Sequence, residues 1–404
     1  MSMAVVETPT QNWLNRRIIS FFYLSVFFPY FKLVPGVDTQ PVALILAICI
    51  FFVARPKKVP VLLFLLVIPF ATAFMMLVLS NMDFSAFRNF LSYISLFLIS
   101  ISTYFALKSR GGFEGKYLSF AVWVLFIVGF IQSFIYKGFL NFLLPRAMSS
   151  FSRGAIGLAP EPSQYGCMCL FLMIFCHFHK PKHDLLLKII LLIQIVVFAR
   201  SSMIVLFLGI LFVLYSIFFL SIRNLFLGVM GVTGLFFLLS QFLHNTRLYQ
   251  ILNILLQNPM LLVLKDGSGN ERFFHIFFSM LGFFRHYGMP GGFSSWKNFM
   301  GQASIEFHDL VWWLPVWNKI LSGYGAAFYE LGIFAIIIPI VLIRLLYINY
   351  QKKLREFWVL AIFLTVILFS SSPLSFPYIG FMFGYLAYYG CIEENKGTRH
   401  EASI

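Results

Sequence analysis

Charged residues are scarce in this chain of 404 residues. Only 11% of the residues are charged, and just 15 are Asp or Glu. Hydrophobic residues make up 60% of the sequence and include 52 Phe. A soluble domain needs a polar surface that so few charges cannot provide. The composition therefore excludes a water-soluble globular protein and indicates one that is embedded in a membrane.

Cysteine is also rare, and the five Cys residues all lie within or beside apolar runs. They do not form the framework of a disulfide-stabilised protein, although Cys167 and Cys169 are close together. The formal net charge of +15 suggests nucleic acid at first sight. The basic residues, however, fall at the ends of apolar runs and never form a dense patch. We therefore expect no nucleic-acid partner.

Long apolar runs recur along the whole sequence, without a tandem repeat or a separate soluble domain. Runs of about 18 or more apolar residues are typical of membrane-spanning helices. The sequence predicts an all-α polytopic membrane protein, with residues 1–404 forming a single integral membrane domain. About 12 transmembrane helices are expected, at 18–34, 41–54, 59–80, 87–107, 117–136, 163–179, 185–199, 202–220, 224–243, 324–346, 356–372 and 374–391.

The distribution of Lys and Arg predicts the orientation, because cytoplasmic connections carry the excess of positive charge. The N-terminus, alternate connections and the C-terminus together carry 18 basic residues. Both termini are therefore predicted to be cytoplasmic, which agrees with an even number of spans. The opposite side, without its one long loop, carries only six: Lys32, Arg88, Lys137, Arg146, Arg153 and Arg200.

The long loop, residues 244–323, is predicted to be external and functional because ordinary connections are much shorter. Ser268 and Glu271 form an S-x-x-E capping box, and Gly288 with Pro290 ends the following run. We predict an amphipathic helix in the membrane interface, its phenyl face down and its polar face toward water or a cavity. The alternative is a lid whose polar face is merely solvated. The polar face carries Arg272, His275, Ser279, Gly282 and His286. The opposite face carries Phe273, Phe274, Phe277, Phe278, Leu281 and Phe284.

A second group of polar residues follows in the same loop. Glu306, His308 and Asp309 precede Trp312, Trp313 and Trp317. Tryptophans at this density suit an interfacial belt, and they equally suit stacking against sugar rings. Metal binding by His308 and Asp309 is an alternative that the sequence does not favour, because no ligand spacing characteristic of a metal site is present. We interpret Cys176, His177, His179 and His183 as interfacial polar residues at the cytoplasmic end of a span, so no metal and no other cofactor is expected.

The connector before the run at 163–179 is richer in polar residues and turn-forming residues than a simple connection requires. It reads RGAIGLAPEPSQYG from Arg153 to Gly166. Two prolines fix the backbone around Glu161, and Ser163 stands where a helix N-cap is expected, with Tyr165 opening the run. Glu161 is either a rigidly held functional anion or a charge at the entrance of a helix.

Arg200 interrupts the apolar stretch from Leu185 to Leu220, where Ala199 and two serines flank it. An Arg near membrane depth costs about 2.5–3.5 kcal/mol at a helix centre on insertion scales, which favours a functional role. The alternative is an anchor at the end of a span, whose long side chain reaches the membrane surface.

The connector, the Arg200 break and a third stretch after the long loop resemble the O-antigen polymerase (Wzy-type) proteins, whose superfamily includes the O-antigen ligases. The central motif with Arg153, Gly157-Leu158, Glu161-Pro162-Ser163 and Gly166 is similar to the family signature. The Arg200-Ser201 break and Glu330-Leu331-Gly332 are further similarities. The chain departs from the ligases at Lys319–Ser322, where they typically have a His-Asn pair. This departure argues against a ligase and leaves the catalytic base unassigned by the resemblance.

The resemblance implies a glycosyltransferase of the bacterial cytoplasmic (inner) membrane, and the reaction is expected to need no metal because the external side offers Arg but no carboxylate pair at a metal-ligand spacing. It would polymerise undecaprenyl-diphosphate-linked oligosaccharide repeat units into O-antigen or exopolysaccharide at the outer face. Membrane lipid, a chain-length regulator and a flippase are the further partners. An O-antigen ligase is the enzymatic alternative, and a lipid-linked oligosaccharide flippase or other transporter is the non-enzymatic one.

The chemistry of this reaction assigns roles to the polar residues of the external side. A diphosphate leaving group needs fixed cations, and Arg offers a planar fork for phosphate oxygens. The attacking hydroxyl needs a base within hydrogen-bond reach. Diphosphate-binding candidates are Arg153, Arg200 and Arg272, with Arg285 in reserve; base candidates are Glu161, His275 and His308; further candidates are Glu330, Asp309 and Tyr165.

Overall fold

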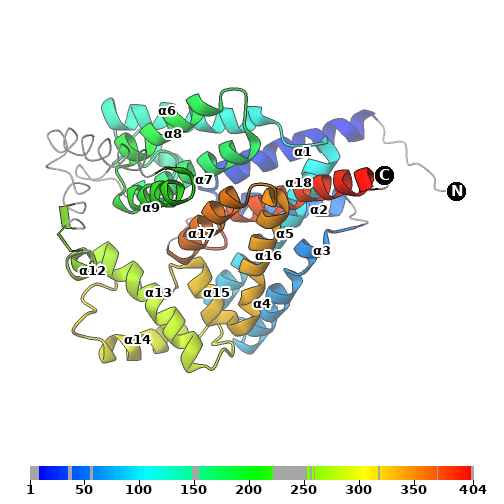
Figure 1. Ribbon diagram of the computed structural model, residues 1–404. Helices are drawn as coiled ribbons and strands as arrows, with labels where there is room; N and C mark the ends of the chain where they lie inside the picture. The colour runs from blue at the N-terminus through cyan, green and yellow to red at the C-terminus, as the bar shows by residue number, and fades with distance from the viewer. Residues whose placement is uncertain are drawn as a thin grey trace.

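The fold is known from a computed structural model, in which the described part of the chain is helical and contains no strand (Figure 1). This confirms the predicted all-α class. The described residues are 9–34, 39–54, 58–147, 154–221, 253–254, 257–258, 260–316, 319–370 and 372–401.

The apolar runs of the first half of the chain all form helices. The run predicted at 59–80 consists of a short and a longer helix separated by two residues. The helices are α1 (Pro9–Phe27), α2 (Val42–Ala54), α3 (Val61–Phe64), α4 (Val67–Leu79), α5 (Phe84–Arg110), α6 (Gly115–Phe134) and α7 (Pro162–His179), with a 3₁₀ turn at Asn141–Leu143.

The second half is also helical, with two changes of helix type near the stretches singled out in the sequence. A π-helical segment precedes Arg200, and a 3₁₀ segment follows Glu330-Leu331. The elements are α8 (Asp184–Ile193), η2 (Gln194–Ala199), α9 (Ser202–Phe219), α12 (Met260–Lys265), α13 (Gly267–Arg285), α14 (Trp296–Glu306), α15 (Gly323–Leu331), η3 (Gly332–Ile336), α16 (Ile337–Tyr350), α17 (Leu354–Ser370) and α18 (Pro377–Glu401).

Four helical stretches within the described residues are long and apolar enough to cross a membrane. They are Val61–Leu79, Phe84–Arg110, Gly115–Phe134 and Gly323–Tyr350. The chain is thus built as a membrane-embedded helical protein. The number of about 12 spans stays a prediction, and the predicted span at 224–243 lies outside the described residues.

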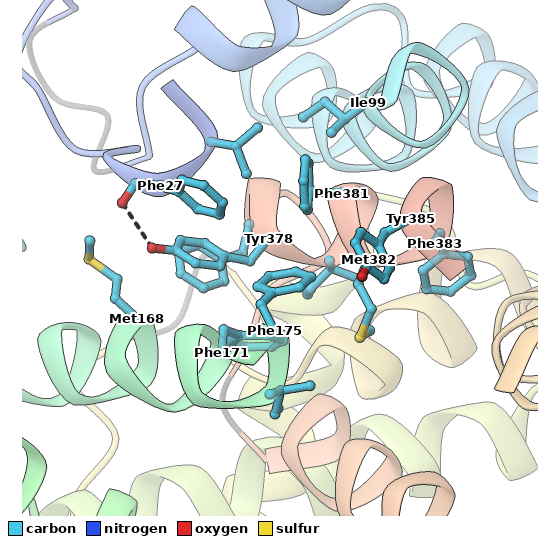
Figure 2. Packing of buried hydrophobic residues seen from close by; sticks show 14 of the residues in the cluster. Phe27, Ile99, Met168, Phe171, Phe175, Tyr378, Phe381, Met382, Phe383 and Tyr385 are labelled. Atoms are coloured by element: carbon cyan, nitrogen blue, oxygen red, sulfur yellow. Dashed lines mark hydrogen bonds between the residues drawn. The ribbon is translucent and has the colours of Figure 1, made fainter. Parts of the chain in front are cut away.

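The core of the molecule lies where α18 packs along α5. A Cβ added at Gly384 would lie 2.3 Å from the carbonyl oxygen of Ser100, so a glycine is required for this close approach. Around α18, aromatic side chains from α1 and α7 fill the space (Figure 2). The hydroxyl of Tyr378 donates to the carbonyl of Phe27 at 2.8 Å, which satisfies a buried polar group in this apolar region.

The long loop contains a second, smaller core, in the yellow-green part of Figure 1. Buried side chains of α13 and α14, including Phe278 and Trp296, pack together with Tyr329 of α15. Asn270 is fully buried and links three segments: its amide nitrogen donates to the carbonyls of Val263 at 3.0 Å and Leu310 at 2.8 Å. The described part of the loop is therefore a packed helical layer against α15.

Polar residues near the ends of different helices contact one another. Arg110, the last residue of α5, pairs with Glu114 at the start of α6 and donates to the hydroxyl of Ser20 in α1 at 2.9 Å. At the ends of α7 and α17, His177 lies 3.6 Å from Glu356. The predicted orientation places these residues at or near the cytoplasmic ends of their spans, and the contacts are consistent with that prediction.

Candidate functional site

A buried amide side chain holds the connector that precedes α7. The Gln132 carbonyl oxygen accepts from the backbone nitrogens of Ile156 at 3.1 Å and Gly157 at 2.7 Å. Its nitrogen donates to the carbonyls of Gly157 at 3.0 Å and Phe139 at 2.8 Å. Gln132 was not among the residues predicted from the sequence, although it is the one Gln in the apolar run at 117–136 and a polar side chain there indicates a hydrogen-bonding role. Its four hydrogen bonds fix the path of the connector.

Tyr165, a further candidate in the sequence, is fully buried below this connector. Its hydroxyl lies 3.0 Å from the carbonyl of Leu125 and 3.0 Å from the side-chain oxygen of Gln194. Its ring lies against Gly157, where a Cβ would come within 2.5 Å of it. Gly157 also has a φ of +56°, which glycine adopts without strain. Tyr165 therefore links α6, α7 and η2 by hydrogen bonds and packing.

The connector lies directly against the Arg200 break. A Cβ at Gly154 would lie 2.0 Å from the carbonyl oxygen of Ala199, and the Ala155 nitrogen donates to the Phe198 carbonyl at 2.7 Å. The connector and the Arg200 break, which were identified separately in the sequence, are thus joined through their backbones. Arg153, the first residue of the motif, lies outside the described residues.

Arg200 has a left-handed backbone conformation, with a φ of +48°, at the end of the π-helical segment η2. Its Nε donates to the carbonyl of Val197 at 2.9 Å, and the side chain is half-buried. The charge of Arg200 also acts on Lys137. Burial, followed by the charge of Arg200, lowers the pKa of the Lys137 ammonium. Two cations therefore lie near the start of the connector, where an anion would be stabilised.

Glu161 occupies the N-cap position of α7 in an extended conformation, and Pro162 is the first helical residue. The predicted N-cap, Ser163, is therefore already inside the helix. A proline at the first position has a suitable φ and needs no hydrogen bond for its nitrogen, so the helix begins there. The Ser163 hydroxyl donates to the Glu161 carboxylate at 2.8 Å, which orients one of its oxygens.

The predicted capping box of α13 is wrong by two residues. Asp266 is the N-cap, and its carboxylate accepts from the backbone nitrogen of Gly269 at 2.8 Å. Ser268 lies within the helix, where its hydroxyl is 3.4 Å from the Nε of Arg272. Because Asp266 already accepts a hydrogen bond from a free backbone amide of the first helical turn, Glu271 has no capping role.

The middle of the polar face of α13 is buried, as are Phe274 and Phe278 of the phenyl face, whereas Arg272 and His286 are half-buried. His275, Ser279 and Gly282 are buried, whereas Phe273 is 42% and Phe284 66% exposed. The small residues of this face allow α15 to approach closely. A Cβ at Gly282 would lie 2.5 Å from the ring of Tyr329, and one at Gly325 would lie 2.4 Å from the Ser279 hydroxyl. Close packing against α15 thus buries the middle of a face that was predicted to lie toward water or a cavity, and it contradicts the alternative in which this face is merely solvated.

Charged groups in the first turns of α13 act electrostatically on groups at the beginning of α7, and the reverse. The charge of Glu161 acts on Glu271, and that of Arg272 acts on Glu271, on His275 and on the thiol of Cys167. Lys319, just before α15, acts on Glu271 and His275 as well. Segments from the connector, the long loop and the end of that loop therefore converge on one group of charges.

Glu271 is the carboxylate at the centre of this group. Burial is the main factor that raises the pKa of its carboxyl, and the negative charge of Glu161 raises it further. The backbone of Val316 and the charge of Arg272 act in the opposite direction without reversing the rise. Its Oε1 atom is buried and has no hydrogen-bond partner within the described residues. The sequence signal was present, but Glu271 was interpreted as part of a capping box.

His275 is fully buried one turn after Glu271, with its ring 5.9 Å from that of Trp296. Neither ring nitrogen has a hydrogen bond of good geometry to the described residues. Burial lowers the pKa of His275 to about 4, although the backbone of Val316 favours the protonated form. The imidazole is therefore neutral at pH 7 and is a weak base.

The other candidates of the long loop lie on its surface. The side chain of His308 is 75% exposed and its Nε2 lies 3.1 Å from the carboxylate of Asp309, which is 85% exposed. Arg285 donates to both carboxylate oxygens of Glu306, at 2.7 and 2.8 Å. The structure does not bring these three candidates into contact with the group around Glu271, and Trp317 lies outside the described residues.

Glu330 is enclosed by α5 near the opposite end of α15. Its carboxylate accepts from the hydroxyl of Tyr93 at 2.5 Å and from the amide of Asn89 at 3.2 Å. Its backbone carbonyl accepts from Gly292 at 3.2 Å. These contacts join α5, α15 and the segment after α13, so Glu330 positions the helical layer that carries Glu271.

Comparison with known proteins adds no assignment: no family model and no curated protein matches the chain. Among the described residues, no group of three or more His, Cys, Asp and Glu side chains could hold a metal ion. Two carboxylates (Glu161 and Glu271), the guanidinium of Arg272 and the neutral imidazole of His275 are thus linked electrostatically. Two cations, Lys137 and Arg200, lie near the start of the same connector. The resemblance to the O-antigen polymerases stays a prediction.

Proposed function

We propose that this protein polymerises undecaprenyl-diphosphate-linked oligosaccharide repeat units at the outer face of the bacterial cytoplasmic membrane. One observation carries the proposal. The connector 154–161 contacts the Arg200 break at one end, and its Glu161 lies within electrostatic reach of Glu271 at the other. Cations suited to diphosphate and carboxylates suited to a sugar hydroxyl thus lie along one short segment.

The reaction requires these two kinds of group together. The acceptor hydroxyl attacks the anomeric carbon of the donor glycan, and the bond from that carbon to the diphosphate oxygen breaks. Arg200 and Arg272 would stabilise the charge that develops on the diphosphate, because guanidinium groups form strong charge-assisted hydrogen bonds to phosphate. A carboxylate would accept the hydroxyl proton.

A helical membrane protein suits such a substrate. The lipid remains in the bilayer, so its diphosphate lies at headgroup height and the sugars project into the water. We therefore place the connector, the Arg200 break and the long loop on the external side, and both termini in the cytoplasm. The hydrogen bond from Ala155 to Phe198 joins the connector to the Arg200 break, and the charge of Glu161 acts on Glu271 of the long loop; both support the placement of the three stretches on one side.

Reporter fusions test this orientation. A fusion after Arg110 is expected to report a cytoplasmic location and a fusion after Gly291 an external one, because basic residues are retained in the cytoplasm. An alkaline phosphatase and a fluorescent protein, active on opposite sides, serve as mutual controls. The same location for both fusion points would contradict the orientation and the proposed site.

The activity itself is tested with the purified protein and lipid-linked repeat units. We expect a ladder of polymers that forms equally well in excess chelator, because Arg side chains supply the positive charge that a divalent ion provides elsewhere. Gel electrophoresis of the lipid-linked products measures the ladder. A reaction that stops with chelator and resumes with magnesium or manganese would contradict metal independence.

The same assay separates the alternatives. Transfer of glycan to lipid A without chain growth would identify an O-antigen ligase. Movement of intact repeat units across vesicles, without new glycosidic bonds, would identify a flippase or other transporter. With a polymerase, a chain-length regulator is expected to alter the ladder, and a flippase to supply the substrate in cells.

A further inference from the structure

The sequence left the proton acceptor of the reaction open, and the structure narrows the choice. The side chain of His308 is 75% exposed. Both oxygens of Glu330 accept hydrogen bonds from α5. His275 is too weak a base at neutral pH. One oxygen of Glu161 accepts from Ser163, and neither of its oxygens is among the buried atoms of the described residues that have no partner. Glu271, which the sequence predicted only as part of a capping box, meets the requirements best, because its Oε1 atom is buried and has no partner within the described residues.

We infer that Glu271 is the general base, whose carboxylate takes the proton of the acceptor sugar hydroxyl. The inference rests on the proposed function. Its geometric basis is the Oε1 atom, which is buried and unpartnered within the described residues. Such an atom loses its hydrogen bonds to water on folding and gains them back only when a donor binds. A sugar hydroxyl is a donor of the required kind.

The neighbours of Glu271 fit the other parts of the substrate. Arg272 follows it directly and can interact with the diphosphate of the donor. His275 lies one helical turn further on, fully buried, with two ring nitrogens that have no partner of good geometry among the described residues. A residue four positions later lies on the same helix face. A neutral imidazole there provides one donor and one acceptor for a second sugar hydroxyl.

The environment of Glu271 also suits its role. Burial and the charge of Glu161 raise the pKa of its carboxyl, toward the pH at which the protein works. A base is most effective when its pKa lies near the working pH, because it is then both deprotonated and sufficiently basic. The proton passes from the hydroxyl to Glu271 as the new C–O bond forms. The electron pair of the broken C–O bond leaves with the diphosphate, and no other reactant is needed.

The test compares the wild type with Glu271→Gln in the purified polymerisation assay. The amide keeps the size of the side chain but cannot accept the proton. We expect kcat to fall about 10²- to 10⁴-fold with little change in KM. Glu306→Gln is the matched control, since it removes a carboxylate of the same loop that pairs with Arg285 at the surface, and it should retain wild-type kcat.

The pH profile distinguishes a base from a structural residue. The raised pKa of Glu271 means that the wild-type rate should fall as the pH falls through a value above the usual pKa of Glu. Glu271→Gln should lose this acidic limb, and Glu271→Asp, which keeps the charge, should retain it at a lower kcat. Glu271→Asp decides the matter if the Gln variant does not accumulate in membranes.

The failure of the inference differs from the failure of the proposed function. A wild-type protein that forms no polymer would overturn the function and the inference together. Wild-type polymerisation with an unchanged rate and acidic limb in Glu271→Gln would overturn the role of Glu271 alone. Loss of the acidic limb in Glu271→Asp as well would also overturn it, because the limb would then not follow the carboxylate.

Discussion

Gly154→Ala is expected to lower the rate of polymerisation about 100-fold while leaving the helices intact. The added Cβ would lie 2.0 Å from the carbonyl oxygen of Ala199 and 2.4 Å from that of Phe198. Both are backbone atoms, so the connector itself must move by about 1 Å or more. A displacement of about 1 Å between reacting groups can cost about 10²-fold in rate. The hydrogen bond from Ala155 to Phe198 would be weakened by the same movement.

Polymer ladders from cells that lack the native gene measure this effect, with each variant at matched abundance in the membrane. Gly209→Ala is the control, since a Cβ there meets nothing within 4 Å and alanine favours the helix α9. A full-length ladder from Gly154→Ala would show that the contact between the connector and the Arg200 break is not needed for activity. A loss in both variants would point to α9 instead.

Arg200→Lys is expected to slow turnover about 10- to 100-fold although the positive charge is kept. The Nε of Arg200 donates to the carbonyl of Val197 at 2.9 Å, which leaves the other guanidinium nitrogens for a ligand. A lysine ammonium cannot hold this bond and present a planar fork at the same time. A charge-assisted hydrogen bond to phosphate is worth about 1.5–3 kcal/mol, which corresponds to the expected loss.

The alternative role for Arg200 predicts a different result. An anchor at the end of a span needs only a long apolar stem and a charged tip, and lysine has both. Arg344→Lys is the control, because Arg344 lies exposed on α16 over the ring of Tyr347. Normal ladders from both variants would assign Arg200 to anchoring, and Arg153 and Arg272 would remain as candidates for the diphosphate.

The apolar helices were predictable from the sequence because membrane helices are encoded locally. Each predicted run within the described residues contains a helix, since a continuous apolar segment satisfies its backbone hydrogen bonds only within itself in a lipid environment, although the run at 18–34 is helical only to Phe27 and the helices α12 and α14 were not predicted. The prolines beside Glu161 and the Arg at residue 200 were also visible as interruptions of apolar runs. These are properties of a few neighbouring residues, so no knowledge of the fold was needed.

The composition of the site depended on contacts between distant residues. Glu161 and Glu271 are 110 positions apart in the sequence. Only the tertiary structure places α13 close enough to the start of α7 for the charge of Glu161 to act on Glu271. Gln132 was one polar residue in an apolar run until the connector was seen to bind its amide. Neither relation leaves a periodic pattern in the chain.

The choice of which face of α13 is buried depends on the tertiary structure. The sequence by itself determined that this helix is amphipathic, and on its own such a helix would turn its polar face to water. The tertiary structure decided otherwise, because Ser279 and Gly282 are small enough for α15 to pack closely against them. His275 is buried on the same face. Burial of this face removes water from the beginning of α13, which is what raises the pKa of Glu271 and lowers that of His275.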